Sequence, residues 1–367
     1  MRKLFLFVMT SIIFDKGNGL LAMNEEQVNQ TLHKIVLHSP TWEFLTKGDT
    51  VEIIAPSSGP LTASHEHEVK KLIKEHDLEA SLFEGTFNKE SSRYGYYANS
   101  DEERANYFVK ALEGNSKALW PLLGGFGAAE IVAILEQRGF LPPPRPKLII
   151  GFSDITALHL LVATWGWPSL HGPVLGLGKE FYQETHEKVN SEAALGTILK
   201  ILKGEVTHLE YTFEVIHPGA GYMDTPITGS VMGGNLSIIE NHSGTKTALK
   251  GTDRFVFFED TPEDGKRLNR RLVNLMRTGI FDEAKAIIVG HNPVEEHEDS
   301  LLATKGPMDD FVKHFLLPRK IDIPVVYSCR FGHGLYNDIM PLGTEASLRI
   351  QEQHAVLKVS VNESAYK

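Results

Sequence analysis

Short apolar runs alternate with segments of helical period in the first half of the chain. Runs typical of buried strands occur at 51–55, 118–123 and 147–150. Between and after them, apolar residues recur every three to four positions, as at Val69, Leu72 and Ile73, which is typical of one face of a helix. A capping-box pair, Ser100 and Glu103, marks the start of another such helix. Strands that alternate with helices at this spacing predict a parallel sheet covered by helices on both faces.

The second half has a different pattern, with more and shorter strands. Apolar strands are predicted at 227–231, 254–258, 286–289, 323–327 and 355–361. A helix is predicted over 267–276. The stretch from about 179 to 221 is typical of a connection that is polar at first, holds one short helix around 195–202 and ends in a turn-rich break at 217–221. We therefore divide the chain into an N-terminal segment over 1–22, an extension over 23–47, an α/β domain over 48–180, a connection over 181–224 and a smaller, mixed α/β, strand-rich domain over 225–367.

The composition is that of an ordinary globular protein. Of 367 residues, 42% are hydrophobic and 23% are charged, and 37 Lys and Arg against 47 Asp and Glu leave a net charge of −10. The length suits two domains, each able to bury its own core. No stretch has the density of Lys and Arg that phosphate neutralisation requires, which argues against nucleic acid as a partner. The single cysteine excludes an internal disulfide and a four-cysteine zinc site.

The N-terminus has the features of a secretory signal. Arg2 and Lys3 precede an apolar run over 4–14, and the small residue Ala22 follows. This run is too short to cross a bilayer as a helix, and no other stretch is long and apolar enough to do so. We expect a cleaved signal and export to the periplasm, although Leu20 occupies a position where a small residue is preferred. The alternative is an uncleaved amphipathic or buried segment of a cytoplasmic protein.

The junction between a buried strand and a helix at 150–155 contains a candidate nucleophile. Ser153 follows Gly151 by two residues, and a tight strand-to-helix turn would place its hydroxyl at the carboxyl edge of the sheet, where open α/β folds bind ligands. The first backbone N–H groups of the helix would face the same point. The second glycine of a nucleophile elbow is replaced by Ile155. From these residues alone, Ser153 is either a nucleophile or, with Asp154, a simple helix cap.

A glycine-rich turn follows the strand predicted at 118–123. Gly124, Gly125 and Gly127 let the backbone approach a ligand closely and present N–H donors. The spacing is not that of a dinucleotide-binding fingerprint, and no lysine follows as it does in a phosphate-binding loop. The open alternatives are a donor to an oxyanion and a plain turn.

A histidine and two carboxylates in the second half complete a candidate catalytic group. His333 is flanked by glycine on both sides, which leaves its imidazole uncrowded and suits a proton carrier at physiological pH. Glu259 and Asp260 end an apolar strand, and a glutamate there can hold a histidine ring in one tautomer, as the third member of a triad does. The alternative is that both acids only begin the next loop.

The sequence gives weaker support to two other candidate sites, a cysteine–histidine pair and a metal cluster. Cys329 lies four residues before His333, too close in sequence for the pair to face each other easily, and a free cysteine is usually a small buried hydrophobe. His291 and the segment 295–297 contain metal-ligating residue types, but their spacing fits no helical ligand pair. We therefore expect no metal site.

The order of these motifs resembles that of the LD-carboxypeptidase family, the serine peptidases of murein recycling, which also contains microcin-immunity peptidases. The resemblance covers most of residues 48–345. Its ordered segments are GDTV through APS at 48–57, DEER at 101–104, ALW leading to GGFG at 118–127, IGFSDITAL at 150–158, HGP at 171–173, GGNLS at 233–237, FED at 258–260 and GHG at 332–334. Eight matches in this order are highly specific, and they favour the nucleophile interpretation of Ser153.

The resemblance implies roles for individual residues. Ser153 resembles the family's nucleophile, Glu259 its orienting acid and His333 its general base. The backbone N–H groups of Gly125 and Asp154 resemble its oxyanion hole. The resemblance also implies a flavodoxin-like parallel-sheet N-terminal domain, a smaller C-terminal domain that supplies the acid and the base, and an active site between the two. It implies neither a metal nor an organic cofactor.

The resemblance further implies a murein-derived peptide as substrate, with an L-centre followed by a terminal D-alanine that leaves through an acyl-enzyme. Arg330 is a candidate for binding the free carboxylate, and a surface or structural role is the alternative. Leu123 departs from the family, which usually has arginine immediately before the glycine pair. The alternatives in function are an immunity-type peptidase that cleaves a peptidyl-nucleotide antibiotic and a non-catalytic binding protein on the same scaffold. Because family members often form homodimers, we expect a homodimer here.

Overall fold

The computed structural model describes residues 41–59, 63–88, 90–176, 187–292, 300–334 and 336–365. The signal predicted over 1–22 and most of the extension lie outside these residues, as does the segment 295–297 of the weaker metal hypothesis. Within the described part of the extension, Trp42 and Leu45 are buried in a hydrophobic core. The folded chain therefore includes residues that precede the domain start expected at position 48.

The N-terminal sheet has six strands in the order β11-β5-β4-β3-β1-β2. The strands are β1 (Thr50–Ile54), β2 (Glu79–Ser81), β3 (Ala118–Pro121), β4 (Leu148–Gly151), β5 (Ser169–His171) and β11 (Met340–Leu342). All neighbours are parallel except β11, which runs antiparallel to β5. The order 2-1-3-4-5 of the parallel strands is that of the flavodoxin fold, so the fold class predicted for this half is confirmed.

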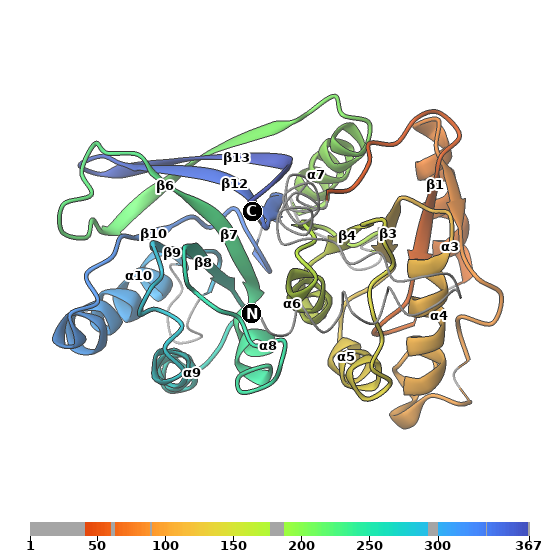
Figure 1. Cartoon of the computed structure of the whole chain (residues 1–367), viewed down its shortest axis with the longest axis horizontal. Coiled ribbons are helices and arrows are strands. Elements are labelled where there is room, and N and C mark those ends of the chain that lie inside the picture. Colours follow the sequence, from red (N-terminus) through yellow and green to blue (C-terminus); the bar gives the residue numbers. More distant parts are fainter. Residues whose placement is uncertain are drawn as a thin grey trace, which may run out of the picture. The chain divides into compact units, whose positions relative to one another are not determined.

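Helices cover both faces of this sheet (Figure 1). They are α3 (Ala63–Glu75), α4 (Asp101–Glu113), α5 (Ala128–Gln137), α6 (Thr156–Thr164) and α7 (Glu187–Leu202). Val51 and Ile53 of β1 pack in one core with α3 and α7, whereas Ile54 packs in a second core with α4, α5 and α6. Because alternate side chains of a strand point to opposite faces, these two cores lie on opposite faces of the sheet. The cap predicted for α4 is confirmed, since the Ser100 hydroxyl accepts from the Glu103 backbone N–H at 3.3 Å.

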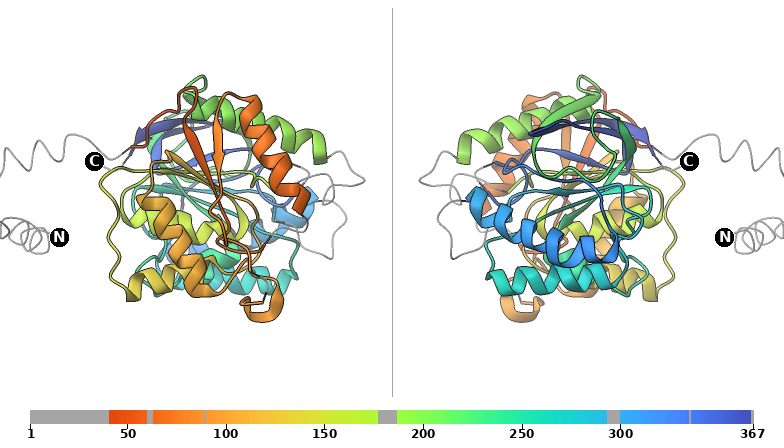
Figure 2. Two further views of the ribbon diagram at one scale, coloured as in Figure 1. Left: turned by 90° about the vertical axis from the view of Figure 1, so that its right-hand side faces the viewer. Right: turned by 90° about the vertical axis from the view of Figure 1, so that its left-hand side faces the viewer.

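The C-terminal half is built around a closed barrel in the order β10-β6-β13-β12-β7-β8-β9. The strands are β6 (His208–His217), β7 (Ile227–Asn235), β8 (Arg254–Glu259), β9 (Ala286–Val289), β10 (Val325–Tyr327), β12 (Thr344–Ile350) and β13 (His354–Ser364). The pairs from β7 through β8 and β9 to β10 are parallel, and the other pairs are antiparallel. The short helix α8 (Leu236–Asn241) follows β7 directly, and α9 (Gly265–Arg277) and α10 (Ser300–Phe311) lie side by side (Figure 2, right). This half therefore has the mixed, strand-rich character that the sequence predicts.

The segment 181–224 is more than the predicted connection. Its helix α7 buries Ile198 and Leu199 in the core of the first sheet, and its strand β6 belongs to the barrel. Alternate apolar residues of β6, such as Leu209 and Phe213, give the period-two signal of a half-buried strand, which a search for continuous apolar runs misses. Among the helices described, none has both the length and the apolar character needed to cross a bilayer.

Candidate active site

Ser153 lies in a tight turn between β4 and α6. β4 ends at Gly151, a short 3₁₀ turn spans Ser153–Ile155, and α6 begins at Thr156. The Ser153 backbone is in the left-handed region, with φ +61°, which a non-glycine residue adopts only at a cost. Gly151 has φ +144°, and a Cβ atom there would come within 2.9 Å of Ile155 Cγ2. The glycine before the serine therefore makes room for Ile155, which replaces the second glycine of the usual elbow.

Ser153, His333 and Glu259 form one series of hydrogen bonds. Nε2 of His333, in the loop after β10, is 3.0 Å from Oγ of Ser153, and Nδ1 is 2.7 Å from Oε2 of Glu259. Glu259 ends β8 and is fully buried, and the His333 side chain is largely buried. An ionised carboxylate only accepts hydrogen bonds, so its contact assigns the imidazole proton to Nδ1. Nε2 is then a lone-pair acceptor that faces the serine hydroxyl, as a general base requires.

The pKa values of the acid and the base suit this arrangement. Burial alone would raise the pKa of Glu259, but the charge of His333 and hydrogen bonds from His171 and His333 lower it to about 2. Burial would lower the pKa of His333, but the charge and hydrogen bond of Glu259, together with the charge of Asp260, raise it above the 6.5 usual for histidine. Glu259 is therefore ionised at working pH, and it stabilises the imidazolium that forms when His333 takes a proton.

The glycine turn after β3 packs directly against the serine. A Cβ atom on Gly124 would lie 3.2 Å from Cβ of Ser153. Gly125 has φ +112°, and a Cβ atom there would collide with the Ser58 side chain. Asp154 lies in the first turn after the strand, so its backbone N–H is among those that have no acceptor within the helix. Both backbone segments predicted to donate to an oxyanion therefore lie next to Ser153: Asp154 follows it in the chain, and the glycine turn that contains Gly125 packs against it.

The Asp154 side chain fixes the glycine turn to the nucleophile turn. Its buried Oδ2 accepts hydrogen bonds from the Ala128 backbone N–H (2.8 Å) and from the Ser57 hydroxyl (2.5 Å). Burial raises the pKa of Asp154, and these two donors lower it in part. Ala128 is the first residue of α5, so the helix that Asp154 caps is α5 and not its own helix. The Ser153 hydroxyl faces His333 instead of capping a helix.

A buried arginine holds the other end of the glycine turn. Arg104 of α4 is 2% exposed and donates from Nη1 to the carbonyl groups of Pro56 and Gly127. Its Nη2 is 2.5 Å from Oδ1 of Asp101, and its guanidinium lies over the Tyr97 ring. Arg104 thus joins α4 to the glycine turn and to the segment that follows β1.

We expect Arg104→Met to destabilise the protein by about 3 kcal/mol, because two buried carbonyl groups and the Asp101 carboxylate lose this donor. The measurement is urea unfolding followed by circular dichroism. Arg138→Met is the matched control, because Arg138 pairs with Glu102 near the surface, and its loss should cost less than about 1 kcal/mol. Equal losses in the two variants would contradict the structural role of Arg104.

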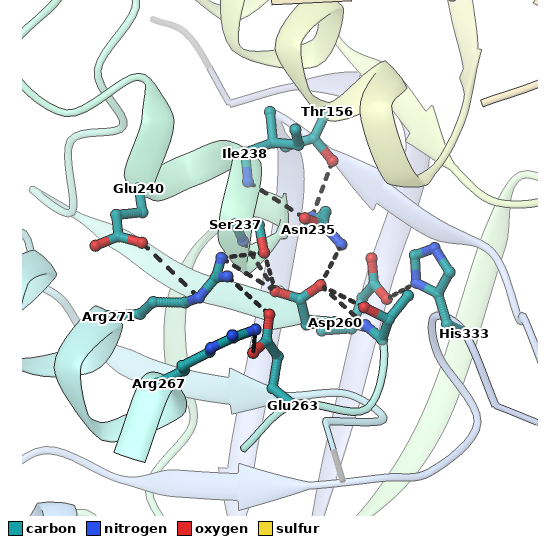
Figure 3. A network of polar contacts seen from close by, with 12 residues as sticks. Thr156, Asn235, Ser237, Ile238, Glu240, Asp260, Glu263, Arg267, Arg271 and His333 are labelled. Atoms are coloured by element: carbon teal, nitrogen blue, oxygen red, sulfur yellow. Dashed lines mark hydrogen bonds and ion pairs between the residues drawn. The ribbon is translucent and has the colours of Figure 1, made fainter. Parts of the chain in front are cut away.

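A polar network joins the helix after the serine to the strand end that carries the acid (Figure 3). The backbone N–H of Asn235 donates to the Thr156 hydroxyl, and the Asn235 amide donates to Oδ1 of Asp260, each at 2.9 Å. Asp260 also accepts from the backbone N–H and the hydroxyl of Ser237, and Arg271 donates to that hydroxyl. Because Thr156 begins α6 and Asp260 directly follows β8, the network holds the nucleophile turn against the end of the acid's strand.

The remaining candidate residues are not part of the hydrogen-bonded series of Ser153, His333 and Glu259. Arg330 forms a two-point ion pair with Asp338, with Nε 2.5 Å from Oδ2 and Nη2 3.1 Å from Oδ1, and it lies over the Tyr336 ring. Cys329 is exposed, and both nitrogens of the site imidazole face other groups, so the structure forms no cysteine–histidine pair there. Within the described residues, His291 belongs to no group of side chains that could hold a metal ion.

Three side chains have contacts at the site that the sequence pattern does not indicate. Arg104 and Asn235 hold backbone segments together, as described above. His171 ends β5, and its Nε2 lies 3.4 Å from Oε1 of Glu259. All three are within motifs of the family resemblance (DEER, GGNLS and HGP), but a motif match predicts no contact between distant segments.

Comparisons with known protein sequences identify the family. Residues 51–172 match the LD-carboxypeptidase N-terminal domain, and residues 228–348 match the LD-carboxypeptidase C-terminal domain. A putative carboxypeptidase of Rickettsia prowazekii is 30% identical over 269 residues, which cover 72% of this chain and 77% of that protein. The murein tetrapeptide carboxypeptidase of Pseudomonas aeruginosa is 28% identical over 314 residues, which cover 84% of this chain and 95% of that protein.

Solved structures have the same fold. Muramoyltetrapeptide carboxypeptidase from Oxalobacter formigenes aligns with a TM-score of 0.63 at 22% identity, covering 84% of this chain and 99% of that chain. The microcin C7 self-immunity protein MccF, solved with aspartyl sulfamoyl adenosine, aligns with a TM-score of 0.66 at 17% identity, covering 87% and 98%. The fold and the matched domains define a peptidase. The chain belongs to the LD-carboxypeptidase family, which confirms the resemblance of its motifs.

Proposed function

We propose that this protein is a serine-type LD-carboxypeptidase that releases the terminal D-alanine of a murein tetrapeptide. The observation that carries the proposal is the hydrogen-bonded series from Ser153 to His333 to Glu259, with 3.0 Å and 2.7 Å between the bonded atoms. The substrate class is supported by relatives, among them a murein tetrapeptide carboxypeptidase that is 28% identical.

The reaction proceeds through an acyl-enzyme. Oγ of Ser153 attacks the carbonyl carbon of the L–D peptide bond while Nε2 of His333 takes the hydroxyl proton. The C–N bond then breaks as His333 returns this proton to the leaving amine of D-alanine. In the second step water attacks the ester, again with His333 as base, and Ser153 regains its proton as the shortened peptide leaves. The N–H groups of Gly125 and Asp154 stabilise the oxyanion in both steps, each contributing on the order of 10²–10³ in rate.

Release of D-alanine from murein tetrapeptide tests the substrate class. The product is measured by chiral chromatography, and the same peptide with a terminal L-alanine is the control. We expect turnover of the D-form alone. Equal turnover of the two peptides would contradict the proposed specificity for an L–D bond.

A fluorophosphonate probe tests the serine mechanism separately, because it reacts with an activated serine hydroxyl and leaves other side chains unmodified. We expect mass spectrometry to find a single labelled peptide, which contains Ser153, and no label in the Ser153→Ala protein. Label on another serine, or no label on a protein that hydrolyses the tetrapeptide, would contradict the proposed nucleophile.

We propose Arg330 as the group that binds the free carboxylate of the substrate. Its ion pair with Asp338 uses Nε and Nη2, so Nη1 is the nitrogen through which it binds a second carboxylate. We expect Arg330→Met to raise KM by about 10–100-fold with little change in kcat, because the contact is the same in the substrate and the transition state. Steady-state kinetics measure both constants, and an unchanged KM would assign carboxylate binding to another residue.

The second candidate is an immunity-type peptidase that cleaves a peptidyl-nucleotide antibiotic. It is supported by the fold shared with MccF, which was solved with aspartyl sulfamoyl adenosine. We favour the murein substrate, because the likeness to MccF at 17% identity concerns the fold, whereas the murein relative is 28% identical. Parallel assays with aspartyl sulfamoyl adenosine and with murein tetrapeptide distinguish the two. Binding of either compound without turnover would indicate a non-catalytic binding protein.

A further inference from the structure

The buried carboxylate of the site faces two histidines. Oε2 of Glu259 is 2.7 Å from Nδ1 of His333, and Oε1 is 3.4 Å from Nε2 of His171. Among the residues that the structure describes, these two imidazoles are the hydrogen-bond donors to this carboxylate. Backbone packs closely around the rest of the side chain: a Cβ atom on Gly290 would lie 2.8 Å from Cβ of Glu259, and one on Gly332 would overlap with Oε2.

His171 is held in place by the sheet and is inaccessible to substrate. It is the last residue of β5, where it pairs with Gly151 of β4 and Met340 of β11. Its side chain is 0% exposed, and its ring packs edge-on against Phe257 with 5.0 Å between the ring centroids. Its Nδ1 is buried and has no hydrogen-bond partner in the described part of the chain. The polar contact of this imidazole is therefore the one with Glu259.

Packing alone does not explain a histidine at this position. A buried nitrogen without a partner costs stability, and an apolar side chain of similar size would avoid that cost. The carboxylate of Glu259 only accepts hydrogen bonds, so Nε2 of His171 must carry a hydrogen. Nε2 donates this hydrogen to Oε1, while Nδ1 has no partner among the described residues. The unpartnered Nδ1 is consistent with a residue that is present for its single donor.

We propose that His171 is a positioning residue: it donates from Nε2 to Oε1 of Glu259 and thereby holds Oε2 toward Nδ1 of His333. The last torsion of a glutamate side chain has broad minima, so one hydrogen bond leaves the carboxylate plane free to turn. A second donor on the other oxygen fixes that plane. The hydrogen bond from His171 also helps to keep the pKa of Glu259 low. This inference rests on the serine-peptidase function proposed above.

The test compares two substitutions at the same position. His171→Leu removes the donor, and we expect kcat to fall about 10–100-fold while KM stays within about twofold, because the residue touches the acid and not the substrate. His171→Gln supplies an amide N–H of similar reach and should recover most of kcat. His242→Leu is the matched control, because His242 is a buried histidine bonded to Thr247 outside the site, and kcat should not change.

A double-mutant cycle separates positioning from a general packing defect. In a Glu259→Gln background, His171→Leu should cause no further loss of kcat, because the charge that His171 positions is already absent. An additive loss in that background would overturn the inference, as would equal losses in His171→Leu and His171→Gln. If circular dichroism shows that His171→Leu does not fold, His171→Asn takes its place, because the shorter amide does not reach Oε1.

Phosphonate labelling of the unmodified protein keeps this test separate from that of the proposed function. If Ser153 is not labelled, the serine-peptidase function fails whatever the His171 variants do. If Ser153 is labelled and every His171 variant keeps full kcat, only the positioning role is overturned.

Discussion

Ser153→Ala is expected to lower kcat by on the order of 10⁵–10⁶, the loss that follows when the serine of a catalytic triad is removed. Alanine differs from serine only by the hydroxyl, so the tetrapeptide should still bind. Release of D-alanine measures the loss of turnover, and isothermal titration calorimetry measures binding. A variant that binds the peptide and does not cleave it would show that the hydroxyl is needed for chemistry and not for recognition.

The positive φ of Ser153 makes glycine a second useful substitution at this position. Ser153→Gly also removes the hydroxyl, but glycine adopts φ +61° without strain, so its free energy of unfolding should exceed that of Ser153→Ala by up to about 1 kcal/mol. Cys329→Ser removes the single, exposed thiol and should keep full activity. An active Ser153→Ala protein, or an inactive Cys329→Ser protein, would contradict the serine nucleophile.

Much of the first sheet can be predicted because its signals are local. β1, β3 and β4 are apolar runs, and the cap at Ser100 needs only its neighbours in sequence. β5 and β11 have three residues each, too few to have a period. Their pairing joins 169–171 to 340–342, and no local pattern predicts a partner at that separation. In this sheet, β5 and β11 are therefore unpredicted because their formation depends on tertiary contacts, whereas β6 of the barrel has a local period-two signal.

In the active site too, local features can be predicted from the sequence and contacts between distant segments cannot. The turn at Ser153 and the glycines beside His333 are local features, and the family resemblance assigns them roles. The distances between them depend on how the sheet and the barrel pack, which no local pattern predicts. Arg104 lies in a charged DEER segment, whose composition is typical of a solvent-exposed helix start. It is nevertheless buried, because two other segments, at Pro56 and Gly127, supply carbonyl acceptors for its guanidinium. Contacts of this kind leave no signal in a single sequence.

The loop that carries the base is anchored in both halves of the protein. β10, before His333, belongs to the barrel, and β11, after it, pairs with β5 of the N-terminal sheet. Tyr211 of β6 donates to the Ile339 carbonyl just before β11. The nucleophile follows β4 and the acid ends β8, so the loop that supplies the base is fixed to the sheets that carry both of its partners.

Glu259→Gln is expected to lower kcat by on the order of 10⁴ and to shift the pH profile, because the variant loses both the charge and the tautomer control of the acid. The amide can donate to Nδ1 of His333, which favours the tautomer with its proton on Nε2, toward the serine. The Glu259 charge raises the pKa of His333, so its removal lowers that pKa. A general base must be unprotonated, so the activity of the unmodified enzyme falls as the pH drops through the pKa of His333, which lies above 6.5. This fall at acid pH, the acid limb of the pH profile, should move to lower pH in the variant.

The measurement is kcat/KM from about pH 4 to pH 9, which reports ionisation in the free enzyme. Glu240→Gln is the matched control, because Glu240 pairs with Arg271 on the side of the network away from His333 (Figure 3), and its profile should match that of the unmodified enzyme. If the acid limb stays in place in Glu259→Gln, a group other than the His333–Glu259 pair titrates there, and His291 is the neighbouring imidazole to test next.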